Sequence, residues 1–243
     1  MSIDVSEHNM TSRSVPSLWR RLLAEFLGTG LLVTVVVGSG IAASKLSPGD
    51  IGLQLLENSF ATALGLAVLI LILASVSGAH FNPVVTLADW FVGRRARGGF
   101  AGRDLAPYVL AQVIGGIGGA VLANLMFDLP TSLSATERVT PGTLLAEVVA
   151  TAGLVLLIFT LARSGRGPVV IGPAVGAYIG SAYWFTSSTS FANPAVTIGR
   201  VFSDTFAGIA PVSVLPFIAA QLGGAVVGVL LVLALFPQRS PSR

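Results

Sequence analysis

The feature that most constrains this chain is a tripeptide that occurs twice. Asn82-Pro83-Val84 in the first half is matched by Asn193-Pro194-Ala195 in the second half, 111 positions later. Each tripeptide follows a long apolar segment and begins a short one. Short apolar segments at corresponding places in two halves of a membrane protein indicate a solute pathway near the middle of the bilayer.

The composition requires a lipid environment. Hydrophobic residues make up 53% of the 243 residues and charged residues only 10%, whereas a soluble domain carries about 25% charged residues.

The chain has no cysteine and only two histidines, His8 and His80, which excludes thiolate chemistry, disulfides and histidine-based metal centres. The sequence also carries no nucleotide-binding loop, nucleophile triad or metal-ligand cluster. We therefore expect no metal, no cofactor and no enzymatic activity. The arginines are scattered between apolar runs, which argues against nucleic acid as a partner.

The lengths of the apolar segments predict an all-α membrane protein. Crossing a hydrocarbon core of about 30 Å takes roughly 20 apolar residues. Two segments, at about 82–92 and 193–203, are near half that length, so we expect re-entrant half-helices whose backbone is satisfied inside the protein. Six segments are long enough to span, at about 22–43, 53–76, 105–127, 142–162, 168–188 and 213–236.

Recurring residues divide the chain into two repeats. Leu22-Leu23-Ala24-Glu25 recurs as Leu144-Leu145-Ala146-Glu147. Three spans per repeat is an odd number, so the second repeat is expected to lie inverted in the membrane, with the two half-helices meeting from opposite faces. The expected parts are an N-terminal tail at 1–21, a first repeat at 22–127, a connector at 128–141, a second repeat at 142–236 and a C-terminal tail at 237–243.

The distribution of basic residues predicts the orientation. Six spans place both termini on one side together with eleven arginines, whereas the other side holds only Lys45, Arg138 and Arg200. Positive residues are enriched on the cytoplasmic side of membrane proteins. We therefore expect a multi-pass protein of the cell (inner) membrane with both termini in the cytoplasm.

With these motifs identified, the chain resembles the major intrinsic protein family, the aquaporins and aquaglyceroporins. The resemblance runs from about Leu22 to Phe236 and rests on Ala24-Glu25-Phe26, on the run from Ser77 to Thr86, and on Asn193-Pro194-Ala195. It implies a passive channel for small neutral solutes, assembled as a homotetramer.

Two departures from the family pattern bear on selectivity. The first motif ends in Val84 where the family usually has alanine. Val196 stands where the family usually has an arginine that narrows the outer pore. The loss of that arginine resembles a bacterial subgroup associated with arsenic resistance.

The repeated motif and the resemblance together assign roles to individual residues. Asn82 and Asn193 are expected to cap the half-helices, with Pro83 and Pro194 at the first helical position, where no hydrogen-bond donor is lost. The positive ends of both half-helices then face one point of the pore, where they repel cations and protons. The resemblance implies that two buried acids, Glu25 and Glu147, accept hydrogen bonds from the re-entrant loops, and that the carbonyls of Gly78, Ala79 and His80 line the pore.

The family register also predicts a selectivity filter. It is expected to contain Thr62, Ser181, Ser190 and Val196, which describes a wide, hydroxyl-lined and uncharged opening. Phe191, Tyr183 or Trp184 could instead turn inward and narrow it. Arg200 lies one helical turn beyond Val196, and we hypothesise that it sits at the outer mouth and pairs with Asp204.

The expected solutes are water, glycerol-sized polyols and undissociated metalloid hydroxides such as arsenous acid, with methylated arsenicals as an extension. Three alternatives stay open. The protein could be a strict water channel or a structural family member with low conductance. It could also be a secondary active transporter, in which Glu25 and Glu147 would relay protons.

Overall fold

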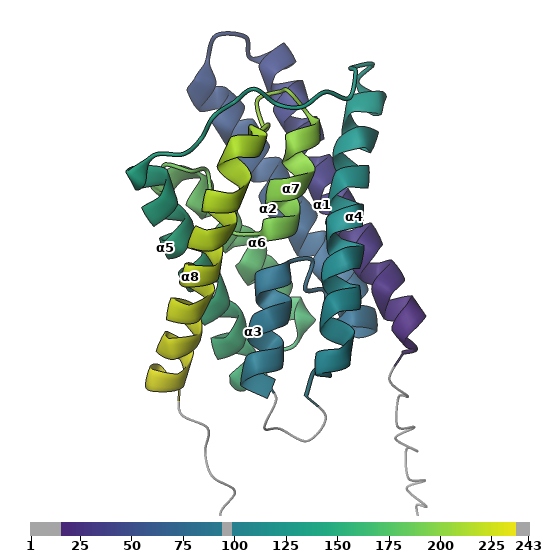
Figure 1. The fold of residues 1–243 in the computed structure, drawn as a ribbon, viewed down its shortest axis with the longest axis vertical. Coiled ribbons are helices and arrows are strands. Elements are labelled where there is room, and N and C mark those ends of the chain that lie inside the picture. Colours follow the sequence, from purple (N-terminus) through teal and green to yellow (C-terminus); the bar gives the residue numbers. More distant parts are fainter. Residues whose placement is uncertain (1–15, 94–98, 237–243) are drawn as a thin grey trace, which may run out of the picture.

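The computed structural model describes residues 16–93 and 99–236, and within these ranges the regular structure is entirely helical (Figure 1). The predicted tails therefore lie largely outside the described residues, as do Arg94, Arg95 and Arg97. The eight α-helices are α1 (Leu18–Leu46), α2 (Ile51–Ser77), α3 (Pro83–Gly93), α4 (Leu105–Met126), α5 (Pro141–Arg163), α6 (Pro168–Phe185), α7 (Pro194–Gly199) and α8 (Pro211–Leu235). Two short 3-10 helices, Gly102–Asp104 and Arg200–Phe202, precede α4 and follow α7.

Most of the long helices are suited to span a bilayer. Within the described residues, five segments are long and apolar enough to cross a membrane, corresponding to α1, α2, α4, α5 and α8. Helix α6 has 18 residues, which is about 27 Å of helix at 1.5 Å per residue. Its last turn carries Tyr183 and Trp184, which lower its apolar character.

The two short helices begin at the repeated Asn-Pro motifs. Helix α3 has 11 residues, whereas α7 has only 6 before the chain tightens into the 3-10 turn Arg200–Phe202. In Figure 1, α7 lies in the upper half of the bundle and α3 in the lower half. Their starting ends meet in the middle, so they run in opposite directions from a common centre.

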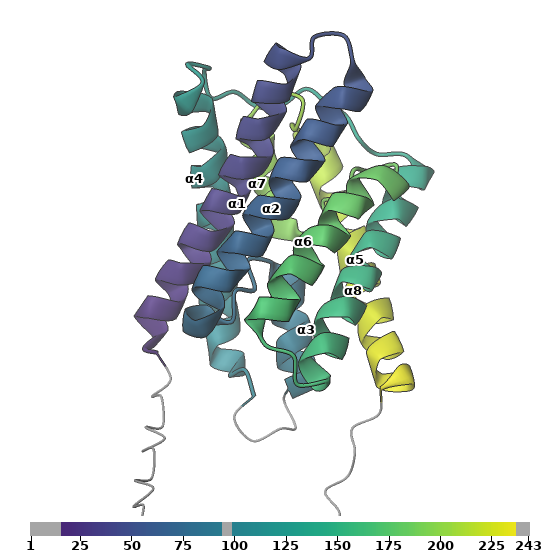
Figure 2. The ribbon, with the colours of Figure 1, turned by 180° about the vertical axis from the view of Figure 1, so that it is seen from behind.

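Helix packing follows the two repeats. Helix α1 packs against α4 and α5 against α8, while α2 packs against α6 between the repeats (Figure 2). The α1–α4 contact depends on glycine, because a Cβ placed on Gly119 would lie 2.0 Å from the backbone oxygen of Gly30. Small residues allow helix backbones in membranes to approach this closely.

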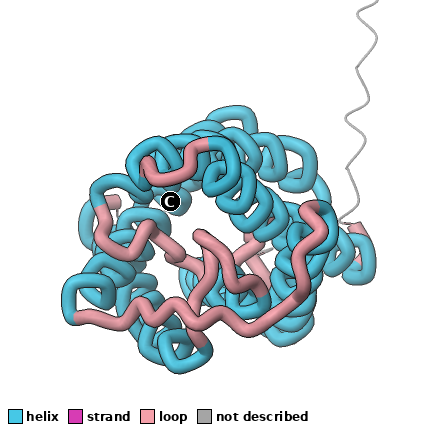
Figure 3. Tube along the Cα trace, turned by 90° about the horizontal axis from the view of Figure 1, so that it is seen from above, coloured by secondary structure: helices cyan, strands magenta, loops and turns pink. Residues whose placement is uncertain are grey.

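The helices surround the two re-entrant loops. Seen from above, they form a ring with loop segments in its middle (Figure 3). The beginning of α1 and the end of α8 lie at the same end of the bundle. The connector between the repeats crosses the opposite end and is tied down by a hydrogen bond from the Ser134 amide to the Val201 carbonyl, at 2.8 Å.

Candidate functional site: a pore between two re-entrant loops

The two motif asparagines hold the centre of the molecule together. The Asn82 side chain donates from Nδ2 to the Ala192 carbonyl at 2.8 Å, and Asn193 donates from Nδ2 to the Phe81 carbonyl at 2.7 Å. Their Oδ1 atoms accept backbone N–H groups of the helices they begin. Each carboxamide nitrogen has a second N–H, and both asparagines line the same cavity. One donor per asparagine therefore remains for a solute.

A buried carboxylate shapes the first loop. Glu25 of α1 is fully buried and accepts hydrogen bonds from Ser77 Oγ (2.6 Å), the His80 amide (3.0 Å), the Phe81 amide (2.7 Å) and Gln112 Nε2 (2.7 Å). These bonds accompany an unusual backbone, since Ala79 and Phe81 have positive φ values of 50° and 49°. Residues other than glycine keep such strained backbone conformations only where surrounding contacts hold them in place.

The second loop repeats this arrangement. Glu147 of α5 is fully buried and accepts from Ser188 Oγ (2.6 Å), the amides of Phe191 and Ala192 (both 2.9 Å) and Gln221 Nε2 (2.7 Å). Thus both acids hold the polar backbone of a re-entrant loop inside protein, as the membrane interior demands. The serine and glutamine partners were not assigned roles in advance, although each recurs at its corresponding position in the second repeat.

The residues after each asparagine are packed tightly. Val84, the departure in the first motif, is fully buried against apolar residues of α5 and α8, including Val155 and Val229. Ala195 is fully buried as well. Neither residue lines the cavity, so Val84 changes the packing behind the pore wall rather than the wall itself.

A cavity runs along the motif asparagines toward one end of the bundle. Its volume is about 60 Å³, several times the roughly 10–15 Å³ that one water requires. A second cavity of about 180 Å³ lies beyond it and is lined by Asp89 and the loop 78–80. The two share six lining residues: Ile70, Ala79, His80, Val85, Ile158 and Val175. They therefore adjoin one another along a common pathway, the smaller cavity toward the end of α7, here called the narrow end, and the larger toward the end of α3.

One wall of this pathway is polar backbone. Gly78, Ala79 and His80 border it, and within the described residues no protein group donates to their carbonyl oxygens. The His80 side chain is held by neighbours: its Nδ1 shares a hydrogen bond with Thr86 Oγ1 at 3.2 Å, and its Nε2 lies 3.4 Å from Asp89 Oδ2. The facing wall is apolar, with Leu154, Ile158 and Val175 among its residues.

The narrow end differs from the predicted filter. Thr62, Ser190 and Val196 line the cavity, but Ser181 does not: it is exposed, and its hydroxyl donates to the Tyr178 carbonyl at 2.8 Å. Tyr183 takes its place, and the Tyr183 hydroxyl lies 3.2 Å from Thr62 Oγ1. Residues two apart on a helix point to different sides, so the family register, which falls two positions before Tyr183, selected the wrong face of α6.

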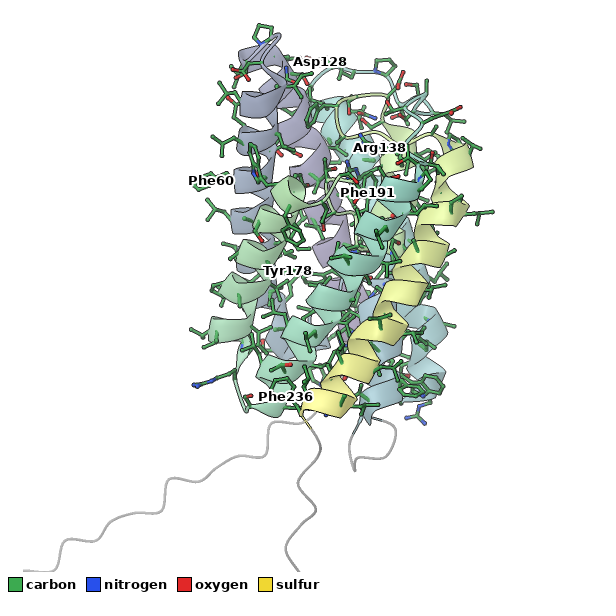
Figure 4. The ribbon with its side chains drawn as sticks, turned by 90° about the vertical axis from the view of Figure 1, so that its left-hand side faces the viewer. Phe60, Asp128, Arg138, Tyr178, Phe191 and Phe236 are labelled. Carbon is green, nitrogen blue, oxygen red and sulfur yellow. The ribbon has the colours of Figure 1, made fainter. Side chains whose placement is uncertain are left out.

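The predicted uncharged opening and the Arg200–Asp204 pair are also wrong. Arg200 is buried and lines the cavity, with its guanidinium carbon 3.5 Å from the Phe191 ring centre. Asp204 instead accepts from Ser134 Oγ and the Ala135 amide. Arg138 of the connector lies over the same ring at 5.4 Å, and Figure 4 shows Arg138 and Phe191 close together at one end of the bundle.

The corrected filter makes a testable distinction between two neighbouring aromatic residues. Tyr183→Ala removes a ring from the cavity wall, so we expect permeation of a four-carbon polyol, erythritol, to rise by about tenfold, which corresponds to a barrier lower by about 1.4 kcal/mol. Trp184→Ala is the matched control, because Trp184 is 52% exposed and lies outside the cavity lining. Light scattering of proteoliposomes measures both rates. A similar rise in the two variants would contradict the assignment of Tyr183.

A bundle of membrane-length helices that encloses two adjoining cavities, with polar backbone along one wall, is typical of helical membrane channels. Comparison with known proteins gives the family. The family model described as Major intrinsic protein matches residues 11–190. The chain belongs to the major intrinsic protein family.

Individual relatives agree with this assignment. The chain is 51% identical over 210 residues to the aquaglyceroporin AqpS of Rhizobium meliloti, covering 86% of this chain and 87% of the relative. It is 33% identical to the glycerol uptake facilitator protein of Pseudomonas aeruginosa, covering 84% and 80%. Among solved structures, the aquaglyceroporin from Plasmodium falciparum matches with a TM-score of 0.68 and 20% identity, covering 91% of this chain and 98% of that one. This structural match supports the shared fold.

Proposed function

We propose that this protein is a passive channel for water and small neutral solutes up to the size of glycerol. The observation that carries the proposal is the pair of cavities that share six lining residues, the first of which is also lined by both motif asparagines. Relatives named as aquaglyceroporins and glycerol uptake facilitators support it. Passive flow needs only such a pathway, without a coupled energy source.

The lining favours neutral hydroxylated solutes. Free carbonyls on one wall and the second N–H of each asparagine offer hydrogen bonds to hydroxyl groups, while the opposite wall is apolar. Glycerol matches such a surface with hydroxyls on one side and carbon on the other. The positive ends of the two half-helices converge in the pore and repel cations and protons. This explanation of their exclusion is general for aquaporin-type pores. Undissociated arsenous acid, a compact neutral trihydroxide, belongs to the proposed solutes for the same reason, and methylated arsenicals extend the range.

Two other functions compete with this proposal. A strict water channel is favoured by Tyr183 and Phe191, whose rings border the narrow end. A structural member with low conductance would carry the same fold with little flow. A proton-coupled transporter receives less support, because both oxygens of Glu25 and both of Glu147 accept hydrogen bonds from fixed protein groups.

Stopped-flow light scattering on proteoliposomes separates these functions. Fast shrinkage followed by fast re-swelling in a glycerol gradient, together with arsenous acid uptake, is the expected result. Water flow without re-swelling would identify a strict water channel. The absence of both water flow and solute flow would identify a structural role. Dependence of solute uptake on an imposed proton gradient would identify a transporter.

Restoring the family arginine tests where the pathway is narrowest. Val196→Arg adds a long cationic side chain to the cavity wall, so we expect glycerol permeation to fall about tenfold and water permeation by less than about threefold, since the larger solute loses more space. The measurement uses the same vesicles and both solutes. An equal loss of both flows in a stably folded variant would show that Val196 does not border the constriction.

The proposal extends to the setting of the channel. We place both termini in the cytoplasm and the protein in the inner membrane, on the distribution of arginines. We also propose the repeats at 22–127 and 142–236, joined by 128–141, and a homotetramer in which each subunit has its own pore. Cross-linking of the purified protein, and labelling of cysteines introduced near either terminus, test these statements.

A further inference from the structure

Arg200 is a buried cation without an acidic partner. Only 2% of the residue is exposed, and no carboxylate within the described residues lies within 4.0 Å of its nitrogens. In the same part of the chain, its side chain makes one hydrogen bond, from Nε to the Ala207 carbonyl. Its two terminal amino groups hold no protein acceptor, and the residue lines the narrow end of the pathway.

Within the described residues, no carboxylate lies within 4.0 Å of Arg200 or of its neighbour Arg138. Arg138 adds a second cation on the Phe191 ring and uses its own donors on the carbonyls of Gly208 (2.6 Å) and Phe206 (3.0 Å). Glu147, the buried acid of the second loop, accepts all four of its hydrogen bonds from groups other than these arginines. The narrow end therefore carries excess positive charge.

A second unpaired donor lies in the same cavity. The Ser190 hydroxyl oxygen is buried and has no hydrogen-bond partner within the described residues. Buried charges in proteins are paired as a rule, because an isolated charge away from water is costly. A planar guanidinium with two free amino groups matches two oxygens of one anion.

We propose that Arg200 and Ser190 form a binding site for a small monovalent oxyanion at the outer end of the pore. The oxyanion accepts hydrogen bonds from the terminal amino groups of Arg200 and from the Ser190 hydroxyl, while the Phe191 ring holds the guanidinium in place. An anion bound there occupies the path of neutral solutes and slows their passage. The inference deepens the proposed function and rests on it.

Methanesulfonate is a suitable probe, because it is ionised at all usable pH values and carries three oxygens. Dimethyl sulfone is its neutral analogue of nearly the same size. We expect methanesulfonate on both sides of wild-type proteoliposomes to halve the glycerol permeation rate at a concentration on the order of 10 mM, the range for a few charge-assisted hydrogen bonds. Dimethyl sulfone is expected to have no effect at that concentration.

Three variants assign the effect. Arg200→Gln should abolish the slowing, and Arg200→Lys should weaken it several-fold, since a single ammonium replaces the planar fork. Arg163→Gln is the matched control: Arg163 also donates to backbone carbonyls, of Val232 and Phe236, but does not line the pathway. Water permeation of each variant reports whether it is folded.

Binding is also measured without flow. Methanesulfonate should raise the unfolding temperature of the wild-type protein in detergent, because a ligand that binds only the folded state stabilises it, and should not raise that of Arg200→Gln. Equal slowing by dimethyl sulfone, or unchanged slowing in Arg200→Gln, would overturn the inference. If Arg200→Gln does not fold, the slowing by methanesulfonate is compared between the wild type and Arg200→Lys, and equal slowing in the two overturns the inference. Thermal stabilisation without glycerol flow would refute the proposed function and leave the anion site standing.

Discussion

Replacing Gly119 with leucine is expected to unfold the channel or prevent its assembly. Even a Cβ at this position would lie 2.0 Å from the Gly30 backbone oxygen, so α1 and α4 would have to separate. Overpacking a core typically costs about 1–3 kcal/mol, and a clash with backbone is harder to relieve, so we expect a loss above about 3 kcal/mol. Thermal unfolding in detergent and the yield of folded protein measure it.

The adjacent glycine provides the control. Gly118 is exposed, and a Cβ there would meet nothing within 4 Å. Gly118→Leu should therefore leave the unfolding temperature and the water permeation close to those of the wild type. Equal damage from both substitutions would mean that helix propensity or insertion, and not the α1–α4 contact, governs the effect.

Removing the carboxylate of Glu147 is expected to have an effect of similar size. Glu147→Ala leaves four buried donors without their acceptor. Each unsatisfied donor costs about 1–3 kcal/mol, so the destabilisation should exceed about 4 kcal/mol, and the second loop should lose its shape. Both the unfolding temperature and water permeation in proteoliposomes should fall sharply.

An exposed acid tests whether charge alone matters. Glu137 lies in the connector and is exposed, so Glu137→Ala should change neither quantity. In the second loop, Thr189, Ser190 and Ala192 have positive φ values. A Glu147→Ala variant that kept wild-type water permeation would show that the loop holds these left-handed residues without the carboxylate. In that case the neighbouring backbone and Gln221, and not Glu147, would hold the shape of the second re-entrant loop.

The parts of the site that could be predicted from the sequence are those fixed by local chemistry and by the repeat. An Asn-Pro pair begins a helix through its own capping bonds, and a glutamate inside an apolar span must face protein. The repeat then places Asn82 beside Asn193 without knowledge of the loops.

The filter could not be predicted in the same way. Its position depends on counting residues through a loop of unknown length, and a two-residue difference exchanges Ser181 for Tyr183. The predicted pairing of Arg200 with Asp204 was wrong for another reason. Asp204 lies four residues later, but α7 ends at Gly199 and the chain changes to a 3-10 turn, so helical spacing no longer brings the two side chains together.

The reciprocal bonds between Asn82 and Ala192 and between Asn193 and Phe81 limit how this channel can be regulated. Each bond joins a side chain of one repeat to a carbonyl of the other, so neither re-entrant loop can shift alone without breaking both. The middle of the pore is therefore its least adjustable part. Any opening and closing of this channel has to occur at its ends, where Tyr183, Arg200 and the pair His80–Asp89 border the two mouths.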